Sequence, residues 1–372
     1  MKLAILITNP NHHVELTIGA AKLMKEEGHQ VTYVSLCELR RMASPVALFK
    51  NEGLDYVKFG KLPQNLKPSS GKQTLGKSDS LLRHLVRRVF WLVKLKPFIK
   101  KNLAGFDKVL LMNDAAFPGD QICSWLKHKS IPFYLLQEGI RFPLPNETDL
   151  KYGANGAKKV MVWGERSAQH FRTIVATGTD VVVTGSPKFD KFLTDIASSP
   201  VKDAKKKVLG VFTNPIDDQG FCSPEVKLEL FERFVQRAAP QLQDMDVQLC
   251  IKCHPRENIE EYLTIANKYL HTIVLPEKIV DAVLAVDAGV IMASTVGLEL
   301  IGAKRRIAQL EIPNFGYVFD YQECQDSVCI PLEGEFDLSI LFGRSTEFTY
   351  FYKHIAAGNS DQKVASVLTE KC

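Results

Sequence analysis

The feature that most constrains the fold of this sequence is a repeated alternation of short apolar segments with longer segments of helical spacing. Lys2–Ile7, Gln30–Ser35 and Asp107–Met112 are rich in β-branched residues and leucine, and each has the length of one strand. Helix-length segments separate such runs, for example Val14–Glu27, which ends before Gly28. This alternation is typical of parallel sheets, because a parallel connection needs a crossover helix. The sequence therefore predicts an α/β protein.

The alternation is interrupted once, near the middle of the chain. Ser198–Lys207 is charged and contains a proline, and the strand pattern restarts at Val208–Thr213. A chain of 372 residues is also longer than one ordinary core supports. We therefore expect two Rossmann-like domains facing a central cleft, the GT-B architecture, divided as 1–197, a linker at 198–207, and 208–372. The last helix is expected to be able to pack back on the N-terminal domain.

Charge and hydrophobicity narrow the class of protein. The formal net charge of +5 permits anionic ligands but does not require nucleic acid, so no nucleic-acid partner is expected. No stretch reaches the roughly 20 apolar residues that span a bilayer. The apolar run Met1–Thr8 stops at Asn9 and Pro10, which fits a first buried strand better than an export signal. We expect a cytoplasmic protein, with attachment to the inner membrane as a further option.

Neither cysteines nor paired carboxylates indicate a metal site. Of eight cysteines only Cys250 and Cys253 form a C-x-x-C pair, and on a strand this spacing places the thiols on opposite faces. Asp217 and Asp218 are adjacent carboxylates without a third ligand nearby in the sequence. We expect no metal and no cofactor.

Two predicted strands end in turns that are suited to anions. Val247–Ile251 runs into a His-Pro turn, and Ala288–Ile291 runs into Met292–Leu300, each before a predicted helix. The N-terminus of a helix presents free N–H groups and the positive end of its dipole, and open α/β sheets bind nucleotides at this edge. Helix capping is the simpler alternative for these groups. The expected contacts to donor phosphate and ribose are Lys252, Pro255, Ser294, Thr295, Val296, Gly297 and Glu299.

Three short motifs on these strand ends resemble a known family. They are Gln137-Glu138-Gly139, His254-Pro255 and Ser294-Thr295, in this order along the chain. They are similar to the acidic-acidic-Gly, His-Pro and Ser-Ser/Thr motifs of bacterial sialyltransferases, polysialyltransferases and Kdo transferases. Longer matches resemble capsule-type glycosyltransferases and CDP-glycerol polymerases, namely Lys252–Pro255, Ser294–Glu299 and Val183–Asp190. The sequence departs from the family at Gln137, where the family has an acid.

The resemblance implies a specific reaction. A sugar of the sialic acid or Kdo type would move from a CMP-activated donor to a surface-polysaccharide, lipopolysaccharide or other glycolipid acceptor, with inversion. Glu138 would remove the acceptor proton and His254 would assist the departing phosphate. A CDP-glycerol or UDP-sugar donor is the alternative within the fold. A non-catalytic scaffold that binds nucleotide or glycan is the alternative of another class, and Gln137 motivates it.

Further polar residues are expected to line the acceptor side of the cleft. Asn9, His12 and His13 follow the first predicted strand, and Gly139 and Arg141 follow Glu138. His13 is the alternative catalytic base, although two neighbouring histidines in a loop commonly have no special role. The partners expected from this pattern are a nucleotide sugar and an oligosaccharide or glycolipid acceptor.

The segment Ser80–Asn102 is a strongly basic amphipathic helix in which Pro97 is expected to kink or end the helix. Its apolar residues alternate with Arg and Lys at helical spacing. One interpretation is that Ser80–Lys101 docks on an anionic membrane surface. The other is a core helix with a solvated basic face, and the sequence does not separate the two.

Overall fold

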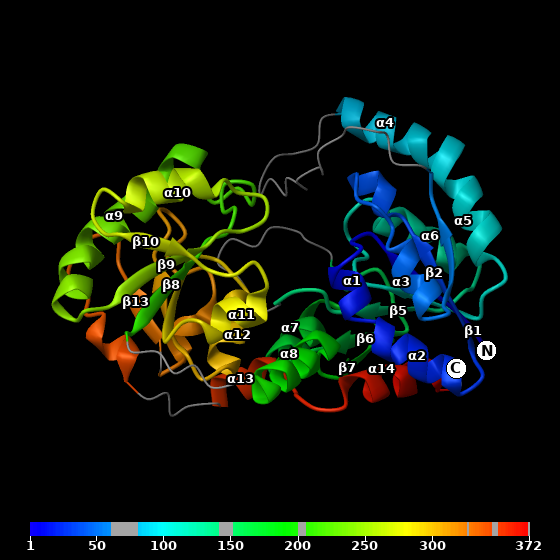
Figure 1. Cartoon of the computed structure of the whole chain (residues 1–372). Coiled ribbons are helices and arrows are strands. Elements are labelled where there is room, and N and C mark those ends of the chain that lie inside the picture. Colours follow the sequence, from blue (N-terminus) through cyan, green and yellow to red (C-terminus); the bar gives the residue numbers. More distant parts are fainter. Residues whose placement is uncertain (61–80, 141–151, 200–205, 326, 344–348, 371–372) are drawn as a thin grey trace.

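The protein has two lobes, each built around one parallel sheet (Figure 1). The computed structural model describes residues 1–60, 81–140, 152–199, 206–325, 327–343 and 349–370. The first sheet has the order β3(Asp55–Lys58), β2(Gln30–Ser35), β1(Lys2–Ile7), β4(Lys108–Leu111), β5(Phe133–Leu136), β6(Lys159–Val162), β7(Asp180–Val183). The second has the order β10(Thr272–Val274), β9(Gln248–Lys252), β8(Val208–Phe212), β11(Ala288–Ile291), β12(Arg306–Leu310), β13(Ser327–Ile330). The predicted α/β class with two parallel sheets is confirmed.

Helices cover both sheets. In the first lobe they are α1(His12–Glu15), α2(Ile18–Glu26), η1(Cys37–Arg40), α3(Val46–Asn51), α4(Leu81–Phe90), η2(Trp91–Leu95), α5(Lys96–Leu103), α6(Gly119–His128), α7(Glu165–Ile174) and α8(Pro187–Ser198). After α8 they are α9(Pro224–Asp244), α10(Ile259–Ala266), α11(Ile279–Leu284), α12(Val296–Gly302), η3(Asp320–Glu323), η4(Ser339–Phe342), α13(Thr349–His354) and α14(Ser360–Thr369).

Strand order reverses once in each sheet, and these two places determine where a ligand can bind. In the first sheet the chain goes β1, β2, β3 outward and then returns to β4 on the other side of β1. In the second sheet β8 and β11 are the neighbours at the reversal. Because the connections leave in opposite directions there, the carboxyl ends of these strands frame a crevice.

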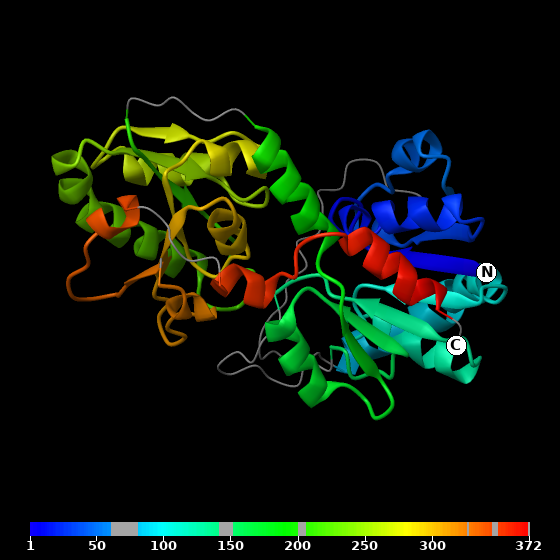
Figure 2. The same cartoon turned by 90° about the horizontal axis from the view of Figure 1, so that it is seen from below.

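The C-terminal segment returns from the second lobe to the first, as Figure 2 shows. The α14 helix packs against α2, and the Asp190 carboxylate accepts hydrogen bonds from Gly358 N and Ser360 N at 2.7 Å each. Gly185 permits the close passage, because its φ is +81° and an added Cβ would lie 2.2 Å from the Ala356 carbonyl oxygen.

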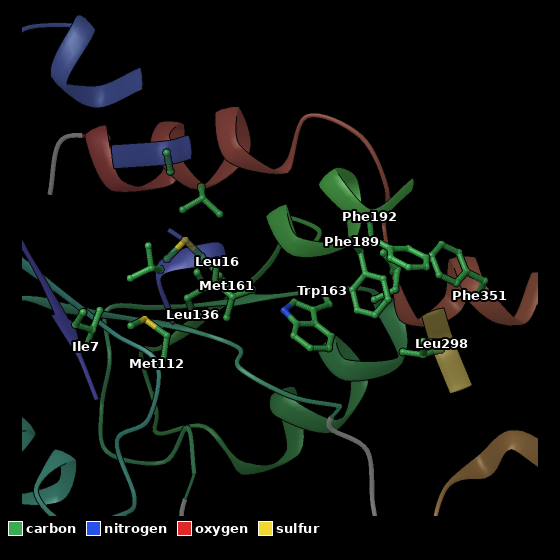
Figure 3. Packing of buried hydrophobic residues seen from close by; sticks show 14 of the residues in the cluster. Ile7, Leu16, Met112, Leu136, Met161, Trp163, Phe189, Phe192, Leu298 and Phe351 are labelled. Carbon is green, nitrogen blue, oxygen red and sulfur yellow. The ribbon is translucent and has the colours of Figure 1, made fainter. Parts of the chain in front are cut away.

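A shared hydrophobic cluster joins the lobes (Figure 3). The Trp163 ring lies 5.6 Å from that of Phe189, and Phe189 lies 6.0 Å from Phe351. Leu298 of α12 belongs to the same cluster. These residues come from both lobes. Their packing therefore holds the two sheets, with the polar groups at their carboxyl ends, in a fixed relative position.

Several predicted elements differ from the structure. The predicted helix Val14–Glu27 is two helices, α1 and α2, and α1 already begins at His12, so the two histidines lie on a helical turn. The edge strands β3 and β13 lie in parts of the sequence to which we assigned no element. Pro97 does not end the basic helix: a π-helical stretch, η2, precedes it and α5 continues. In the part of the chain that the structure describes, no helix is long and apolar enough to cross a membrane.

Candidate active site

Glu138 carries a carboxylate that is held on both oxygens at the crevice of the first sheet. It follows β5, and its side chain is 22% exposed. Its Oε2 accepts a hydrogen bond from His13 Nε2 at 2.9 Å, and its Oε1 accepts one from Asn113 Nδ2 at 2.7 Å. Two donors on one carboxylate stabilise the ionised form and fix its orientation.

The backbone sets the tautomer of His13. Thr8 N donates to His13 Nδ1 at 3.2 Å, so the ring proton lies on Nε2, the atom that faces Glu138. A second proton on Nδ1 would oppose the Thr8 N–H. The His13 side chain is almost fully buried. His13 therefore presents its Nε2–H to Glu138 and positions this carboxylate, which disfavours its alternative role as the base.

Asn113 holds the other carboxylate oxygen, and its own orientation is fixed. Its Oδ1 accepts from Ala115 N at 3.1 Å and from Ala116 N at 2.9 Å, in the turn that follows β4. The amide nitrogen must therefore point away from that turn, toward Glu138. Sequence reasoning missed this residue, although a polar side chain directly after a strand beside the reversal was a usable signal.

Gln137 explains the departure from the family motif. Its side chain is fully buried. Its Nε2 donates to the Gly139 carbonyl at 2.7 Å and to Ser167 Oγ at 2.9 Å, while its Oε1 accepts from Trp163 N at 2.9 Å. This position needs a donor and an acceptor on one side chain, which an ionised acid cannot provide. Gln137 shapes the turn that carries Glu138, so its identity does not signal a lost base.

His12 lies beside the same turn. Its Nε2 hydrogen-bonds the Glu138 carbonyl oxygen. Burial, together with the nearby Lys188 cation, lowers the pKa of His12 to about 4, so the ring is neutral near pH 7. Asn9 holds the turn that precedes this helix, because its Oδ1 accepts from Asn11 N and His12 N at 3.1 Å each. The last residue predicted on this side, Arg141, lies outside the described residues.

A buried ion pair connects the two lobes at the crevice. Lys188 Nζ of α8 lies 2.7 Å from Glu299 Oε1 of α12. Burial lowers the pKa of Lys188, but the Glu299 carboxylate outweighs this, and the net pKa is raised. Glu299 is 2% exposed, and its Oε2 has no hydrogen-bond partner among the described residues. Lys188 lies within a motif that we quoted, but we predicted no role for it.

In the second lobe, His254 follows β9. Its backbone N donates to Thr213 Oγ1 at 3.0 Å, and its Nδ1 accepts from Arg256 N at 3.2 Å, which places the proton of the neutral ring on Nε2. Burial and then the Arg256 charge lower the pKa of His254. Lys252 Nζ donates a hydrogen bond to the Cys253 carbonyl oxygen at 3.2 Å, so this ammonium group binds the local backbone.

The turn after His254 leads into helix α10. Pro255 lies in a turn, and helix α10 begins only at Ile259, where Asn258 caps it by accepting from Glu260 N at 3.2 Å. The helix predicted after the His-Pro turn is present, and three residues separate its first residue from Pro255. Any anion at His254 would therefore meet the imidazole and turn amides rather than a helix end.

The second predicted motif also leads into a helix. Helix α12 begins at Val296, whose N donates to Ser294 Oγ at 3.3 Å, so Ser294 takes part in local capping. Thr295 stands at the N-cap position and makes no side-chain cap bond. Close packing requires glycine at position 297, because an added Cβ would lie 2.4 Å from the Tyr321 ring. Tyr321 OH in turn donates to the Ser294 carbonyl at 2.9 Å.

The adjacent carboxylates Asp217 and Asp218 are used in ion pairs. Asp217 lies 2.9 Å from Lys227 Nζ, and Asp218 lies 3.3 Å from Arg256. Lys227 also contacts Glu257 at 3.0 Å. Among the described residues, no group of three or more His, Cys, Asp or Glu side chains could hold a metal ion.

Asn214 is a further polar residue at this crevice that sequence reasoning missed. It follows β8, and its Nδ2 donates to the Ala293 carbonyl at 2.8 Å, which ties the ends of β8 and β11 together. Its Oδ1 is buried without a hydrogen-bond partner in the described structure. With Glu299 Oε2, it is one of two buried acceptors left unpaired on this side.

Comparison with known proteins supports the fold. No protein-family model matches the chain, and no curated protein sequence matches it. Its structure is similar to that of the UDP-GlcNAc 2-epimerase from Methanocaldococcus jannaschii, with a TM-score of 0.61 and 11% identity over 99% of both chains. It is also similar to the glycotransferase of kitacinnamycin, with a TM-score of 0.58 and 11% identity over 99% of this chain and 97% of that one. A third similar structure is the UDP-GlcNAc 2-epimerase from Neisseria meningitidis bound to UDP-GlcNAc. Its TM-score is 0.54 and its identity 11%, over 99% of this chain and 98% of that one.

These similarities establish the GT-B fold, two Rossmann-like domains that face a crevice. Two of the named neighbours are UDP-GlcNAc 2-epimerases, and the third is a glycotransferase. The narrower resemblance to sialyltransferases and Kdo transferases rests on the short motifs alone.

Proposed function

We propose that the protein is a glycosyltransferase that uses a UDP-activated sugar. The observation that carries this proposal is the fixed carboxylate of Glu138, held by two donors at the crevice of a GT-B fold. A transferase needs a base at the acceptor hydroxyl, hydrogen-bond donors at the departing phosphate and groups that bind the nucleoside. The two sheet edges offer one set of groups for each task.

The proposed reaction is a single displacement with inversion. The acceptor hydroxyl oxygen forms a bond to C1 of the donor sugar while the bond from C1 to the phosphate oxygen breaks. Glu138 takes the hydroxyl proton, and the electron pair of the broken bond leaves with UDP. His254 donates its Nε2–H to a phosphate oxygen, which stabilises the charge that develops there.

The donor would lie against the second sheet. The phosphates would accept a hydrogen bond from the Thr295 hydroxyl, with His254 alongside. The unpaired Glu299 Oε2 would accept a ribose hydroxyl, which gives a buried acceptor the partner it lacks. The sugar would then extend across the Lys188–Glu299 pair toward Glu138.

The choice of UDP over CMP rests on the neighbours, two of which are named for UDP-GlcNAc. A CMP-activated donor is the second candidate, because His254-Pro255 and Ser294-Thr295 both lie at the sheet edge where the resemblance needs them. We propose a surface polysaccharide, lipopolysaccharide or glycolipid as the acceptor, and no metal requirement.

A thermal-shift panel with UDP, CMP, CDP and GDP tests the donor class. Saturation a hundredfold above the dissociation constant stabilises a protein by about 2.7 kcal/mol. We expect UDP to give the largest shift. A larger shift with CMP would favour the second candidate, and no shift with any nucleotide would contradict both. Incubation with UDP-GlcNAc alone adds a control, since appearance of the C2 epimer without acceptor would indicate an epimerase.

A further inference from the structure

The basic helix of the first lobe has two apolar faces. Helices α4, η2 and α5 run on from one another from Leu81 to Leu103 along the outer edge of this lobe (Figure 1). One face packs into the core through the buried side chains Trp91, Leu95 and Ile99. The packing of this inner face explains why the helix is part of the fold. It does not explain why the opposite face is also apolar.

The opposite face exposes large hydrophobic side chains at helical spacing. Their exposed fractions are 59% for Leu85, 59% for Val86, 52% for Val89, 49% for Leu92 and 61% for Val93. These are half of the ten large hydrophobic residues that are exposed in the described chain, gathered on little more than two turns. An apolar patch of this kind, bordered by charge, marks an interaction surface.

The positive charge around this patch favours a negatively charged partner. Residues 81–105 contain seven Lys or Arg and no Asp or Glu, whereas the whole chain has an excess of only five positive charges. Arg87, Arg88 and Lys94 lie beside the exposed hydrophobic residues, and all three are exposed. A helix with an apolar stripe flanked only by cations is complementary to an anionic bilayer, where the stripe enters the acyl boundary and the cations meet phosphate.

A pocket lies beside the helix and borders a second, smaller pocket near the candidate catalytic groups. Leu39, Arg40 and Phe117 line it together with Phe90 of α4. Arg40 and Phe117 also line a second pocket, which reaches His13 and Asn113, the two residues that hold Glu138. The walls combine aromatic and aliphatic surface with charged groups.

One polar group in the first pocket points to a hydroxyl-bearing ligand. Glu38 is 9% exposed, and its Oε2 has no hydrogen-bond partner among the described residues. Its Oε1 is engaged with Ser44 Oγ at 2.7 Å. A sugar hydroxyl would give Oε2 the donor it lacks.

We propose that the outer face of α4, η2 and α5 docks on an anionic bilayer, and that the pocket beside it admits the head group of a membrane-anchored glycolipid acceptor. The acceptor part rests on the proposed transferase function. The docking part does not, because it depends only on the helix surface.

Vesicle flotation of the full-length protein tests the docking. We expect it to float with vesicles that contain phosphatidylglycerol and to stay unbound with pure phosphatidylcholine, and added salt should weaken the binding. The double variant Val86→Asp/Val93→Asp should lower the partition by about tenfold or more, because each change places a charge at the acyl boundary. Ile340→Asp is the matched control, since Ile340 is 48% exposed in the other lobe.

The outcomes separate docking from catalysis when UDP binding is measured on the same samples. Flotation lost in the double variant, with UDP affinity and folding unchanged, supports the proposal. Absence of flotation in the wild-type protein, or equal flotation of the double variant and Ile340→Asp, overturns it. Flotation without UDP binding would keep the docking surface and remove the transferase.

Discussion

The two sheet edges hold their polar groups in opposite ways. At the first, His13 and Asn113 each donate a hydrogen bond to Glu138, and the backbone fixes both donors. At the second, Glu299 and Asn214 keep buried oxygens without a partner in the described chain. A set that is complete without ligand suits chemistry, because its orientation needs no rearrangement. A set with unpaired acceptors suits binding, because a ligand supplies the missing donors.

The comparison predicts that the largest effect on turnover comes from the first edge. Glu138→Gln keeps the shape of the side chain but removes the base, so turnover should fall about a thousandfold. UDP affinity, measured by calorimetry, should stay within about twofold. Glu229→Gln, an exposed change on α9, is the control. Unchanged turnover in Glu138→Gln would remove this carboxylate from the mechanism.

The next largest effect is on stability, at Gln137. Gln137→Glu restores the acid of the family motif, yet a buried carboxylate cannot donate to the Gly139 carbonyl, so unfolding free energy should fall by about 2–4 kcal/mol. Urea unfolding followed by circular dichroism measures it. Gln243→Glu, on an exposed part of α9, should change it by under about 0.5 kcal/mol. A stable Gln137→Glu protein with higher turnover would show that the position is catalytic.

At the second edge the expected effect is on affinity. His254→Ala removes the imidazole proposed to contact phosphate, and UDP should bind about tenfold more weakly, or about 1.4 kcal/mol. His271→Ala changes a surface histidine of the same lobe and should leave affinity unchanged. If both variants bind UDP like the wild type, His254 does not touch the donor.

The last expected effect is a pH dependence of stability from His12. Its pKa is lowered to about 4 in the folded protein from 6.5, so the unfolded chain binds more protons between these values. Stability should therefore be full above pH 6.5 and decline as pH falls toward 4, by about 2 kcal/mol once partial exposure of the side chain is allowed for. Thermal melts of His12→Gln should show a shallower decline than the wild type, and an identical one would contradict this assignment.

Strand periodicity was sufficient to predict the two sheets, because buried parallel strands are continuous apolar runs that leave a clear pattern. The edge strand β3 was missed because its residues Asp55–Lys58 are half charged and only partly buried. Asn113 and Lys188 could not be placed from the sequence, since their roles depend on contacts with Glu138 and Glu299, which lie 25 and 111 positions away.

The hypothesis that Gln137 marks a lost catalytic acid also depended on contacts that the sequence does not show. A motif shows which residue types follow one another but not which side chain is buried. Only the contacts with Trp163 and Ser167 show that Gln137 faces inward while Glu138 faces the crevice.

The most direct test of this division of labour is a crystal structure of the protein with UDP. We expect the diphosphate beside His254 and Thr295, a ribose hydroxyl at Glu299 Oε2, and the bonds from His13 and Asn113 to Glu138 unchanged. UDP bound instead against Glu138, or a Glu138 carboxylate released from both donors, would contradict the assignment of catalysis to the first edge and donor binding to the second.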